Sequence, residues 1–279
     1  MTVKIVTDST SDISQKLAAE LGITVVPLTV SFGNEHFKDG VSITPEQFFT
    51  RLTSQNIYPT TTQPSPGLFL ETFEKLCEET DEILVITVSS KLSGTLSSAK
   101  NAAAIIHGRC QVEVIDSQRV IMGTGLLAIY AAELAKTGLN LKELSQAISQ
   151  KLDDCHPIMY FDTLTYLHKG GRMGKAQSLV GTMLSIKPIL KMEDGIICPL
   201  SKVRSPRAGM DYLYKFINSY PKIKYLAVEH ATSPEDADEL VERLGNILPK
   251  EQIFRSRIGP VVGTYTGANA VAVTVLEDK

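Results

Sequence analysis

The sequence predicts an α/β protein of two domains, the first around a mainly parallel sheet and the second around a mixed sheet. In the first half, short apolar runs alternate with helical patterns, which is typical of strand–helix–strand units with parallel pairing. In the second half, two strand-like runs flank Asp194-Gly195, a dipeptide typical of tight hairpins and hence of antiparallel pairing. The change of pattern near residue 156 divides the chain into domains of residues 1–156 and 157–279.

Along the first domain, the apolar runs predict four strands and the helical patterns predict six helices. Pro27 interrupts the second strand, whereas Pro45 and Pro66 suit the first turn of a helix because the φ angle of proline is preset for it. Ser11 or Asp12 is the expected cap of the first helix. The expected strands are residues 3–7, 24–32, 83–88 and 112–115, and the expected helices are residues 13–21, 45–52, 66–77, 94–106, 126–135 and 141–152.

The second domain is expected to contain five strands and two helices. Apolar residues make up 43% of the 279 residues, which is enough to build a core in each domain. The expected strands are residues 186–192, 196–200, 224–228, 253–257 and 270–276, and the expected helices are residues 207–219 and 234–244.

Composition argues against several classes of function. The net charge is -3, 6% of the residues are aromatic and none is tryptophan, so nothing suggests a nucleic acid partner. The cysteines are far apart and no histidines cluster near them, so neither a metal site nor a zinc motif is expected. A basic leader and an apolar stretch of about 18 residues are both missing, so we expect no membrane insertion. The sequence therefore predicts a cytoplasmic protein without a metal or a cofactor.

Hydroxyl side chains gather where the apolar run 83–88 ends and a helix is expected to begin. The segment KLSGTLSSAK, residues 91–100, contains Ser93, Gly94 and Thr95. Helix N-termini at the carboxyl ends of strands present free N–H groups to ligands, and glycine lets the backbone come close. The segment therefore suits a small anion such as a carboxylate or phosphate. Ser93 could instead only cap the helix, and both readings stay open at this point.

Similar turns occur at residues 8–12, 60–67 and 259–267, and each follows or precedes an expected strand or helix. Nucleotide and hydrolase motifs are absent or out of place: no P-loop or G-x-S-x-G occurs, and G-x-G-x-x-A at residues 123–128 is separated from the preceding strand. A small-molecule kinase or hydrolase that used Ser93 would need a base within reach of it, and the motifs offer none. Such an enzyme is the alternative to a binding protein.

A basic, glycine-rich turn, KGGRMGK, occupies residues 169–175. One interpretation is a helix end with a solvated basic face, since glycine commonly ends helices. The other is a contact with an anion or a partner through Arg172.

Eight motifs, taken together and in this order, resemble the DegV family along nearly the whole chain. They are TDSTSDI (7–13), TTTQPSP (60–66), KLSGT (91–95), IDSQRVIMGTGL (115–126), DTLTYLHKGGRMGKA (162–176), KPIL (187–190), PLSKVRS (199–205) and GPVVGTYTG (259–267). The resemblance implies two α/β domains that enclose a long apolar tunnel, with a long-chain fatty acid such as palmitate as the ligand. Some members of the family are the fatty-acid-binding subunit of a bacterial fatty acid kinase, and they present the acyl group to a separate ATP-using subunit. The resemblance thus implies a lipid-binding protein and not an enzyme.

The resemblance also implies which residues act. Arg172 matches a surface arginine linked to docking of the kinase subunit. The family's late loop usually reads GTHTGPG, and residues 263–269 here read GTYTGAN, so Tyr265 stands where the family has histidine. Tyrosine can still donate to a carboxylate, whereas histidine could also carry charge during phosphoryl transfer, so the change concerns the kinase partnership more than lipid binding. The residues expected at the carboxylate are Thr61, Thr62, Ser93, Gly94, Thr95 and Tyr265.

Overall fold

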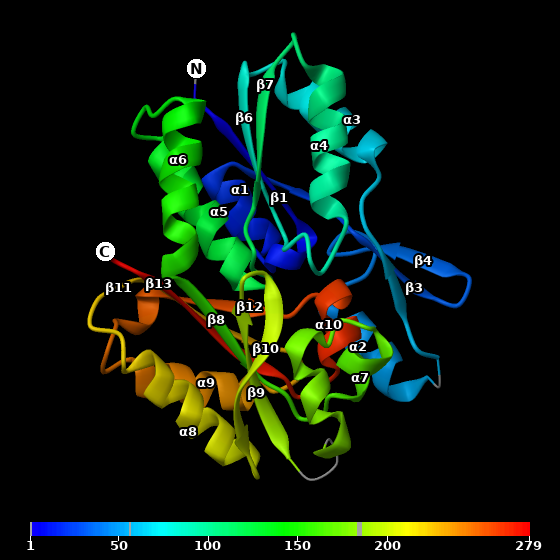
Figure 1. The fold of residues 1–279 in the computed structure, drawn as a ribbon, viewed down its shortest axis with the longest axis vertical. Coiled ribbons are helices and arrows are strands. Elements are labelled where there is room, and N and C mark those ends of the chain that lie inside the picture. The colour runs from blue at the N-terminus through cyan, green and yellow to red at the C-terminus, as the bar shows by residue number, and fades with distance from the viewer. Residues whose placement is uncertain (1, 56, 183–185) are drawn as a thin grey trace.

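The computed structural model describes residues 2–55, 57–182 and 186–279, and it has two α/β units stacked end to end with a small third sheet at their side (Figure 1). The first unit is built on a four-stranded sheet in the order β2-β1-β6-β7, in which every neighbouring pair is parallel. This confirms the mainly parallel sheet expected of the first half. Its strands are β1 (Lys4–Asp8), β2 (Ile23–Val26), β6 (Glu82–Thr87) and β7 (Gln111–Asp116).

Helices cover both faces of this sheet. Successive residues of its strands point to opposite sides, and apolar residues occur on both, so each face needs a cover. Ile5 packs in one core with Leu126, and the next residue, Val6, packs in another with Phe69 and Phe73. The helices on the first side are α1 (Gln15–Leu21), α5 (Met122–Ala135) and α6 (Leu141–Lys151), and those on the second are α3 (Pro66–Leu76) and α4 (Thr95–Ile106) (Figure 1).

The second unit is built on a six-stranded mixed sheet in the order β10-β9-β8-β13-β11-β12, which confirms the expected mixed pairing. β11 and β12 are parallel, and the other neighbours are antiparallel. The turn between β9 and β10 is the predicted hairpin, with positive φ angles of 49° at Asp194 and 73° at Gly195. The strands are β8 (Cys155–Tyr160), β9 (Lys187–Glu193), β10 (Ile196–Val203), β11 (Ile223–His230), β12 (Ile253–Arg257) and β13 (Val271–Glu277).

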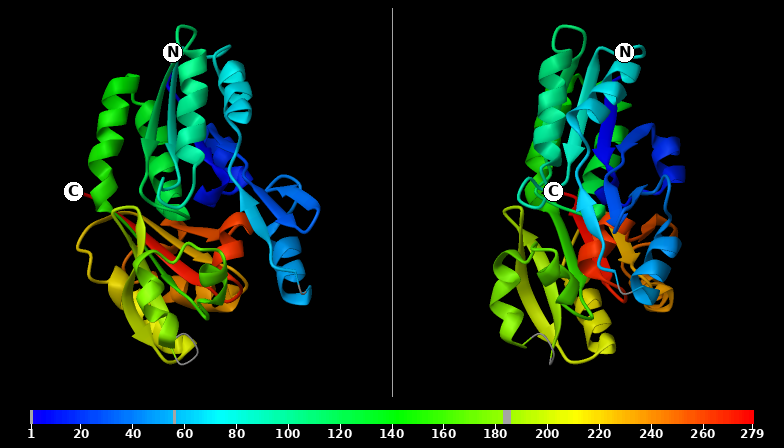
Figure 2. Two further views of the ribbon diagram at one scale, coloured as in Figure 1. Left: turned by 45° about the vertical axis from the view of Figure 1, so that its right-hand side comes forward. Right: turned by 90° about the vertical axis from the view of Figure 1, so that its right-hand side faces the viewer.

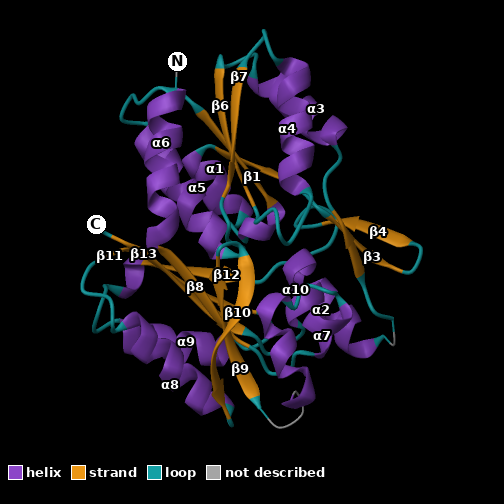
Figure 3. Ribbon diagram, in the orientation of Figure 1, coloured by secondary structure: helices purple, strands orange, loops and turns teal. Residues whose placement is uncertain are grey.

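The two faces of this second sheet have different neighbours (Figures 2 and 3). α8 (Pro206–Ile217) and α9 (Pro234–Leu244) cover one face through a core that contains Leu213 and Leu240. α7 (Thr165–Lys169) and α10 (Pro260–Thr266) lie against the other face, and a 3₁₀ helix, Gly174–Thr182, follows α7. Ala227 and Leu276 of this sheet belong to the core of the first unit, so α5 fastens the two units together.

A three-stranded antiparallel sheet, β4-β3-β5, makes the expected single strand at residues 24–32 wrong. The chain leaves the parallel sheet at Pro27, and the residues after it pair elsewhere. The small sheet and α2 pack on the second unit, where Val30 and Phe48 share a core with Val261. A segment inside the expected domain 1–156 therefore packs with residues of 157–279. Its elements are β3 (Thr29–Phe32), β4 (Glu35–Lys38), α2 (Pro45–Ser54) and β5 (Thr60–Thr62).

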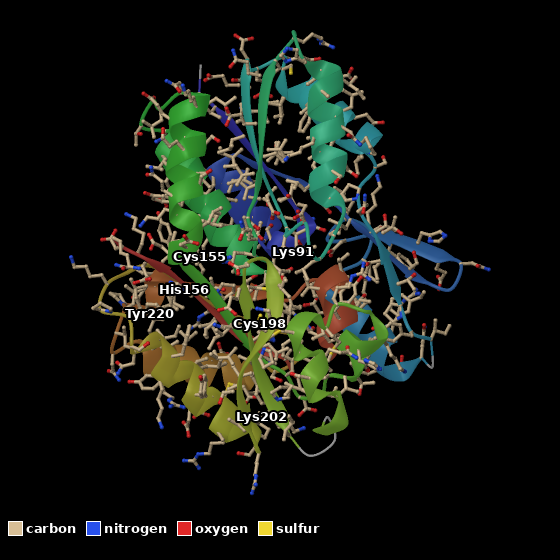
Figure 4. All side chains as sticks on the ribbon, in the orientation of Figure 1. Lys91, Cys155, His156, Cys198, Lys202 and Tyr220 are labelled. Carbon is tan, nitrogen blue, oxygen red and sulfur yellow. The ribbon has the colours of Figure 1, made fainter. Side chains whose placement is uncertain are left out.

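Two local expectations also change. The expected division after residue 156 falls inside β8, and Cys155 and His156 lie where the first unit gives way to the second (Figure 4). The first long helix begins at residue 15 and its cap is Ser14, whose side chain accepts from Leu17 N–H. Ser11 and Asp12 were the wrong caps, because a short 3₁₀ turn, Ser9–Ser11, ends at Asp12 with a left-handed φ of 53°.

Candidate functional site

A cavity of about 310 Å³ lies between the two units, and six of the seven predicted site residues line it. This volume is within the range of small-molecule pockets. Hydroxyls mark one part of its wall, and the remainder is mostly apolar and comes from both units. The predicted residues that line it are Thr61, Thr62, Ser93, Gly94, Arg172 and Tyr265, and the apolar ones are Leu28, Val88, Leu92, Val120, Met159, Phe161, Leu167, Ile197, Val261 and Val262.

A hydrogen bond between the small sheet and the second unit lies at the polar part of the cavity. Thr61 Oγ1 on β5 lies 2.5 Å from Tyr265 Oη on α10, although the residues are 204 positions apart. Either hydroxyl can be the donor, and the one that accepts keeps its own O–H free to donate to a ligand. The ring of Tyr265 fits because Gly170 has no side chain: a Cβ there would lie 2.5 Å from Tyr265 Cε1. Gly170 belongs to the basic turn, so that turn positions a site residue.

Arg172 is exposed, as expected of a surface residue, and it also lines the cavity. Its guanidinium lies 5.1 Å from the centroid of the Tyr265 ring. It donates to Gly170 O at 2.7 Å and, across to the first unit, to Leu92 O at 3.3 Å. The basic turn does end a helix, since α7 stops at Lys169. Arg172 additionally connects this helix end with the loop after β6.

The loop after β6 contributes Ser93 and Gly94, and Lys91 of this loop lies at the level where the units meet (Figure 4). The cap of α4 is Gly94 and not Ser93, and it makes no side-chain capping bond. Ser93 Oγ lies 2.8 Å from Thr95 Oγ1 and accepts weakly from Thr95 N–H at 3.4 Å. Thr95 is fully buried and does not line the cavity, so its hydroxyl supports Ser93 from behind.

Gln63 is a residue that sequence reasoning missed. It lines the cavity, and its Nε2 donates to Ser98 Oγ at 3.1 Å. Its side chain lies against Gly94 so closely that a Cβ at residue 94 would be 2.6 Å from Nε2. The signal was present in the segment TTTQPSP, where the only side-chain amide stands between the hydroxyls and the helix.

Four buried carboxylates surround the junction, and three of them bond across it. Asp12 accepts from Gly259 N–H at 3.0 Å, Asp39 from Val261 N–H at 3.4 Å, and Glu229 from Met122 N–H at 3.2 Å. Asp8, at the end of β1, accepts from Val88 N–H at 2.8 Å. No lysine or arginine pairs with any of the four in the part of the chain that the structure describes.

Burial is the main influence on the ionisation of these carboxylates. It raises the pKa of Asp39 to about 7 and the pKa of Glu229 to about 8. The pKa of Asp12 is raised well above its usual range by burial and by the nearby charges of Glu229 and Asp39. Burial also raises the pKa of Asp8, and its bonds from Thr10 and Val88 oppose that shift. Near neutral pH, the junction therefore contains protonated carboxyl groups.

The fold agrees with what comparison with other proteins shows. A family model described as "Uncharacterised protein, DegV family" matches residues 2–278. The chain belongs to the DegV family. A DegV domain-containing protein of Caldanaerobacter subterraneus is 35% identical over 274 residues, which is 97% of each chain.

Solved structures of DegV proteins share this fold over the whole chain. A DegV family protein from Thermus thermophilus, described by its fatty acid binding, has 30% identity and a TM-score of 0.92. DegV from Bacillus subtilis, described as a fatty acid binding protein, has 28% identity and a TM-score of 0.92. In both cases each chain is covered to 100%. The two-unit α/β architecture is therefore that of the DegV fold.

Over residues 2–55, 57–182 and 186–279, no group of three histidine, cysteine, aspartate or glutamate side chains could hold a metal ion. No helix in those ranges is both long and apolar enough to cross a membrane. The hydrogen bonds of the Ser93 side chain within the described chain involve Thr95, so no base is bonded to its hydroxyl as a nucleophile would require.

Proposed function

We propose that this DegV protein binds a long-chain fatty acid such as palmitate in the cavity between its two units. The observation that carries the proposal is a wall of hydroxyls, from Thr61, Ser93 and Tyr265, that continues into an apolar lining. Hydroxyls satisfy a carboxylate by donating to it, while the apolar lining takes the acyl chain. The two solved relatives described by fatty acid binding support the same ligand class.

The energetics separate the roles of the head and the tail. A hydrogen bond to a charged group contributes about 1.5–3 kcal/mol, so losing one hydroxyl donor weakens binding without abolishing it. The tail contributes more: at ~0.8 kcal/mol per buried CH₂, a sixteen-carbon chain has roughly 10 kcal/mol available before the ordering of ligand and protein is subtracted. The tail therefore provides the affinity, and the hydroxyls orient the carboxylate.

We further propose that the protein presents this carboxylate to an ATP-using kinase subunit and performs no turnover alone. Ser93 lacks a bonded base, which argues against the alternative of a hydrolase or small-molecule kinase built on this residue. Arg172 is exposed beside the cavity and can contact a partner. The cysteines at 77, 110, 155 and 198 are free thiols, which supports the reducing cytoplasm as the place of action.

The test of fatty acid binding is mass spectrometry of the purified protein and of its organic extract. We expect a long-chain fatty acid to be carried through purification. After delipidation, Ser93→Ala should lower palmitate affinity by about tenfold or more, because it removes one donor to a charged acceptor. Ser97→Ala, at an exposed serine of the helix that follows Ser93, is the matched control and should bind as the unmodified protein does. A protein that carries no lipid and ignores added palmitate would refute the proposal.

The kinase role has its own test. With a cognate kinase subunit, ATP and palmitate, we expect acyl phosphate to form, and the protein alone should form none. Arg172→Ala should weaken binding to the kinase subunit, whereas Lys175→Ala, an exposed cation of the same turn, should not. If Arg172→Ala binds the kinase subunit as well as Lys175→Ala does, Arg172 is not part of the interface.

A further inference from the structure

Tyr58 lies just before β5, close in the chain to the site that the hydroxyls of Thr61, Ser93 and Tyr265 form, which we call the head-group site. It is not itself among the residues that line the cavity. The residue before a proline is restricted to extended backbone, and the buried Pro59 follows Tyr58, so the chain enters β5 with little freedom. The direction in which the Tyr58 side chain leaves the backbone is therefore well defined.

The hydroxyl of Tyr58 bonds to two helices of the second unit. Tyr58 Oη lies 2.6 Å from Tyr166 O of α7 and 3.0 Å from Thr264 O of α10, and it can donate to either carbonyl or share its hydrogen between them. The two carbonyls lie 108 and 206 positions further along the chain. One side chain therefore ties the start of β5 to both helices.

Each of these carbonyls lies beside a part of the head-group site. Thr264 directly precedes Tyr265, whose hydroxyl lies 2.5 Å from Thr61 Oγ1. Tyr166 O also accepts from Gly170 N–H at 2.9 Å, and Gly170 is the residue against which the ring of Tyr265 packs. The same hydroxyl thus reaches the backbone that carries Tyr265 and the backbone that supports its ring.

The ring of Tyr58 is held by contacts that do not involve its hydroxyl. The rings of Tyr58 and Tyr166 are stacked, with centroids 6.0 Å apart and an angle of 22° between their planes. Tyr166 fits because residue 267 is glycine, since a Cβ on Gly267 would lie 2.6 Å from Tyr166 Cε2. Lys169 Nζ lies 5.5 Å from the centroid of the Tyr58 ring, a distance at which a cation is attracted to a ring face. Phenylalanine at position 58 would keep all of these contacts.

We propose that Tyr58 is a positioning residue of the head-group site, a proposal that rests on fatty acid binding in the cavity. Its hydroxyl holds β5 against α10, so that the Thr61–Tyr265 pair presents its free O–H to the carboxylate. Hydrogen bonds weaken steeply as their distance and angle depart from the ideal, so a small displacement of β5 reduces this donation. The acyl tail makes apolar contacts, which do not depend on direction in this way. Tyr58 thus serves recognition of the carboxylate and not binding of the tail.

The test compares palmitate with 1-hexadecanol, which has the same tail and an uncharged head group, on the delipidated protein. Tyr58→Phe should lower palmitate affinity by about three- to tenfold, because a donor to a charged acceptor is displaced. Hydrogen bonds to an uncharged group are weaker, so the affinity for 1-hexadecanol should change less than about twofold. A general loosening of the fold would instead weaken both ligands equally. Tyr212→Phe, at a half-buried tyrosine of α8, is the matched control and should leave both affinities unchanged.

A measurement without ligand tests the positioning itself. If Tyr58 holds the Thr61–Tyr265 pair, Thr61→Val should change the unfolding equilibrium constant at least about threefold less in the Tyr58→Phe background than in the unmodified protein. Strictly additive effects on unfolding, unchanged palmitate affinity in Tyr58→Phe, or an equal loss of affinity for both ligands would each overturn the proposal. If the unmodified protein bound no palmitate, the proposed function would fail, and the coupling in unfolding would still decide whether Tyr58 positions the pair.

Discussion

Replacing Gly94 by alanine tests how the loop after β6 is built. The backbone of Gly94, with φ of -78° and ψ of 9°, is open to alanine, so the substitution causes no backbone strain. The new Cβ would, however, lie 2.6 Å from Gln63 Nε2, and the amide must move. Its hydrogen bond to Ser98 is then lost, at a cost of about 0.5–1.5 kcal/mol.

A second effect opposes this loss. Replacing a glycine by alanine at a compatible position stabilises the folded protein by about 0.4–1 kcal/mol, because alanine gives the unfolded chain less conformational freedom to lose on folding. The net change in the free energy of unfolding of Gly94→Ala should therefore be close to zero. With Gln63→Ala already present, no bond remains to be lost, and Gly94→Ala should stabilise the protein. The coupling free energy between the two substitutions should equal the contribution of the Gln63–Ser98 hydrogen bond, about 0.5–1.5 kcal/mol.

The assay is chemical denaturation of the four proteins of this cycle, with palmitate titration of each. Since Gln63 lines the cavity beside Ser93, we expect Gly94→Ala to lower palmitate affinity by up to about tenfold, the equivalent of one hydrogen bond. In the Gln63→Ala background the further loss should be less than about twofold. If Gly94→Ala changes stability equally in both backgrounds, Gln63 is not the group that the new methyl meets, and the reasoning fails.

Three other predictions concern the junction. Thr61→Val and Tyr265→Phe should show a coupling of about 0.5–1.5 kcal/mol in the free energy of unfolding, and strictly additive effects would mean that their hydrogen bond is not formed. The pKa of Glu229 is raised to about 8 and that of Asp39 to about 7 in the folded protein. The stability that their protonated forms contribute is therefore complete below about pH 4, and it is lost as the pH rises through these two pKa values. Glu229→Gln should flatten this fall in denaturation curves recorded between about pH 5 and pH 9; an unchanged slope would contradict the assignment. Tyr265→His should keep palmitate binding and raise acyl-phosphate formation with a cognate kinase subunit, because histidine can carry positive charge near the head group. If the rate of acyl-phosphate formation does not rise, residue 265 has no part in phosphoryl transfer.

The candidate site could be predicted largely from the sequence because its residues belong to local motifs. Ser93 and Gly94 follow a buried strand directly, and the carboxyl ends of parallel strands share one edge of a sheet. The segment 91–95 was therefore expected to suit a small anion. That Thr61 meets Tyr265 depended on the family resemblance, since no local pattern relates positions 204 apart.

The features that could not be predicted depend on contacts between residues far apart in the sequence. Pro27 showed that a strand was interrupted, but nothing local indicated that the residues after it pair with β4 and β5 in another sheet. Asp39 and Glu229 look like ordinary surface acids, because their backbone partners lie 222 and 107 positions away. Gln63 was missed because its role arises from the absence of a side chain at Gly94.

The place of β13 in the second sheet has a consequence for synthesis of the protein. This strand, residues 271–277, lies between β8 and β11, so it occupies the middle of the sheet although it is the last strand along the described chain. While the ribosome is still making residues 157–270, β8 and β11 each present an unpaired edge, and such edges invite pairing with other chains. The sheet of the nascent second unit therefore stays incomplete until residues 271–277 have emerged.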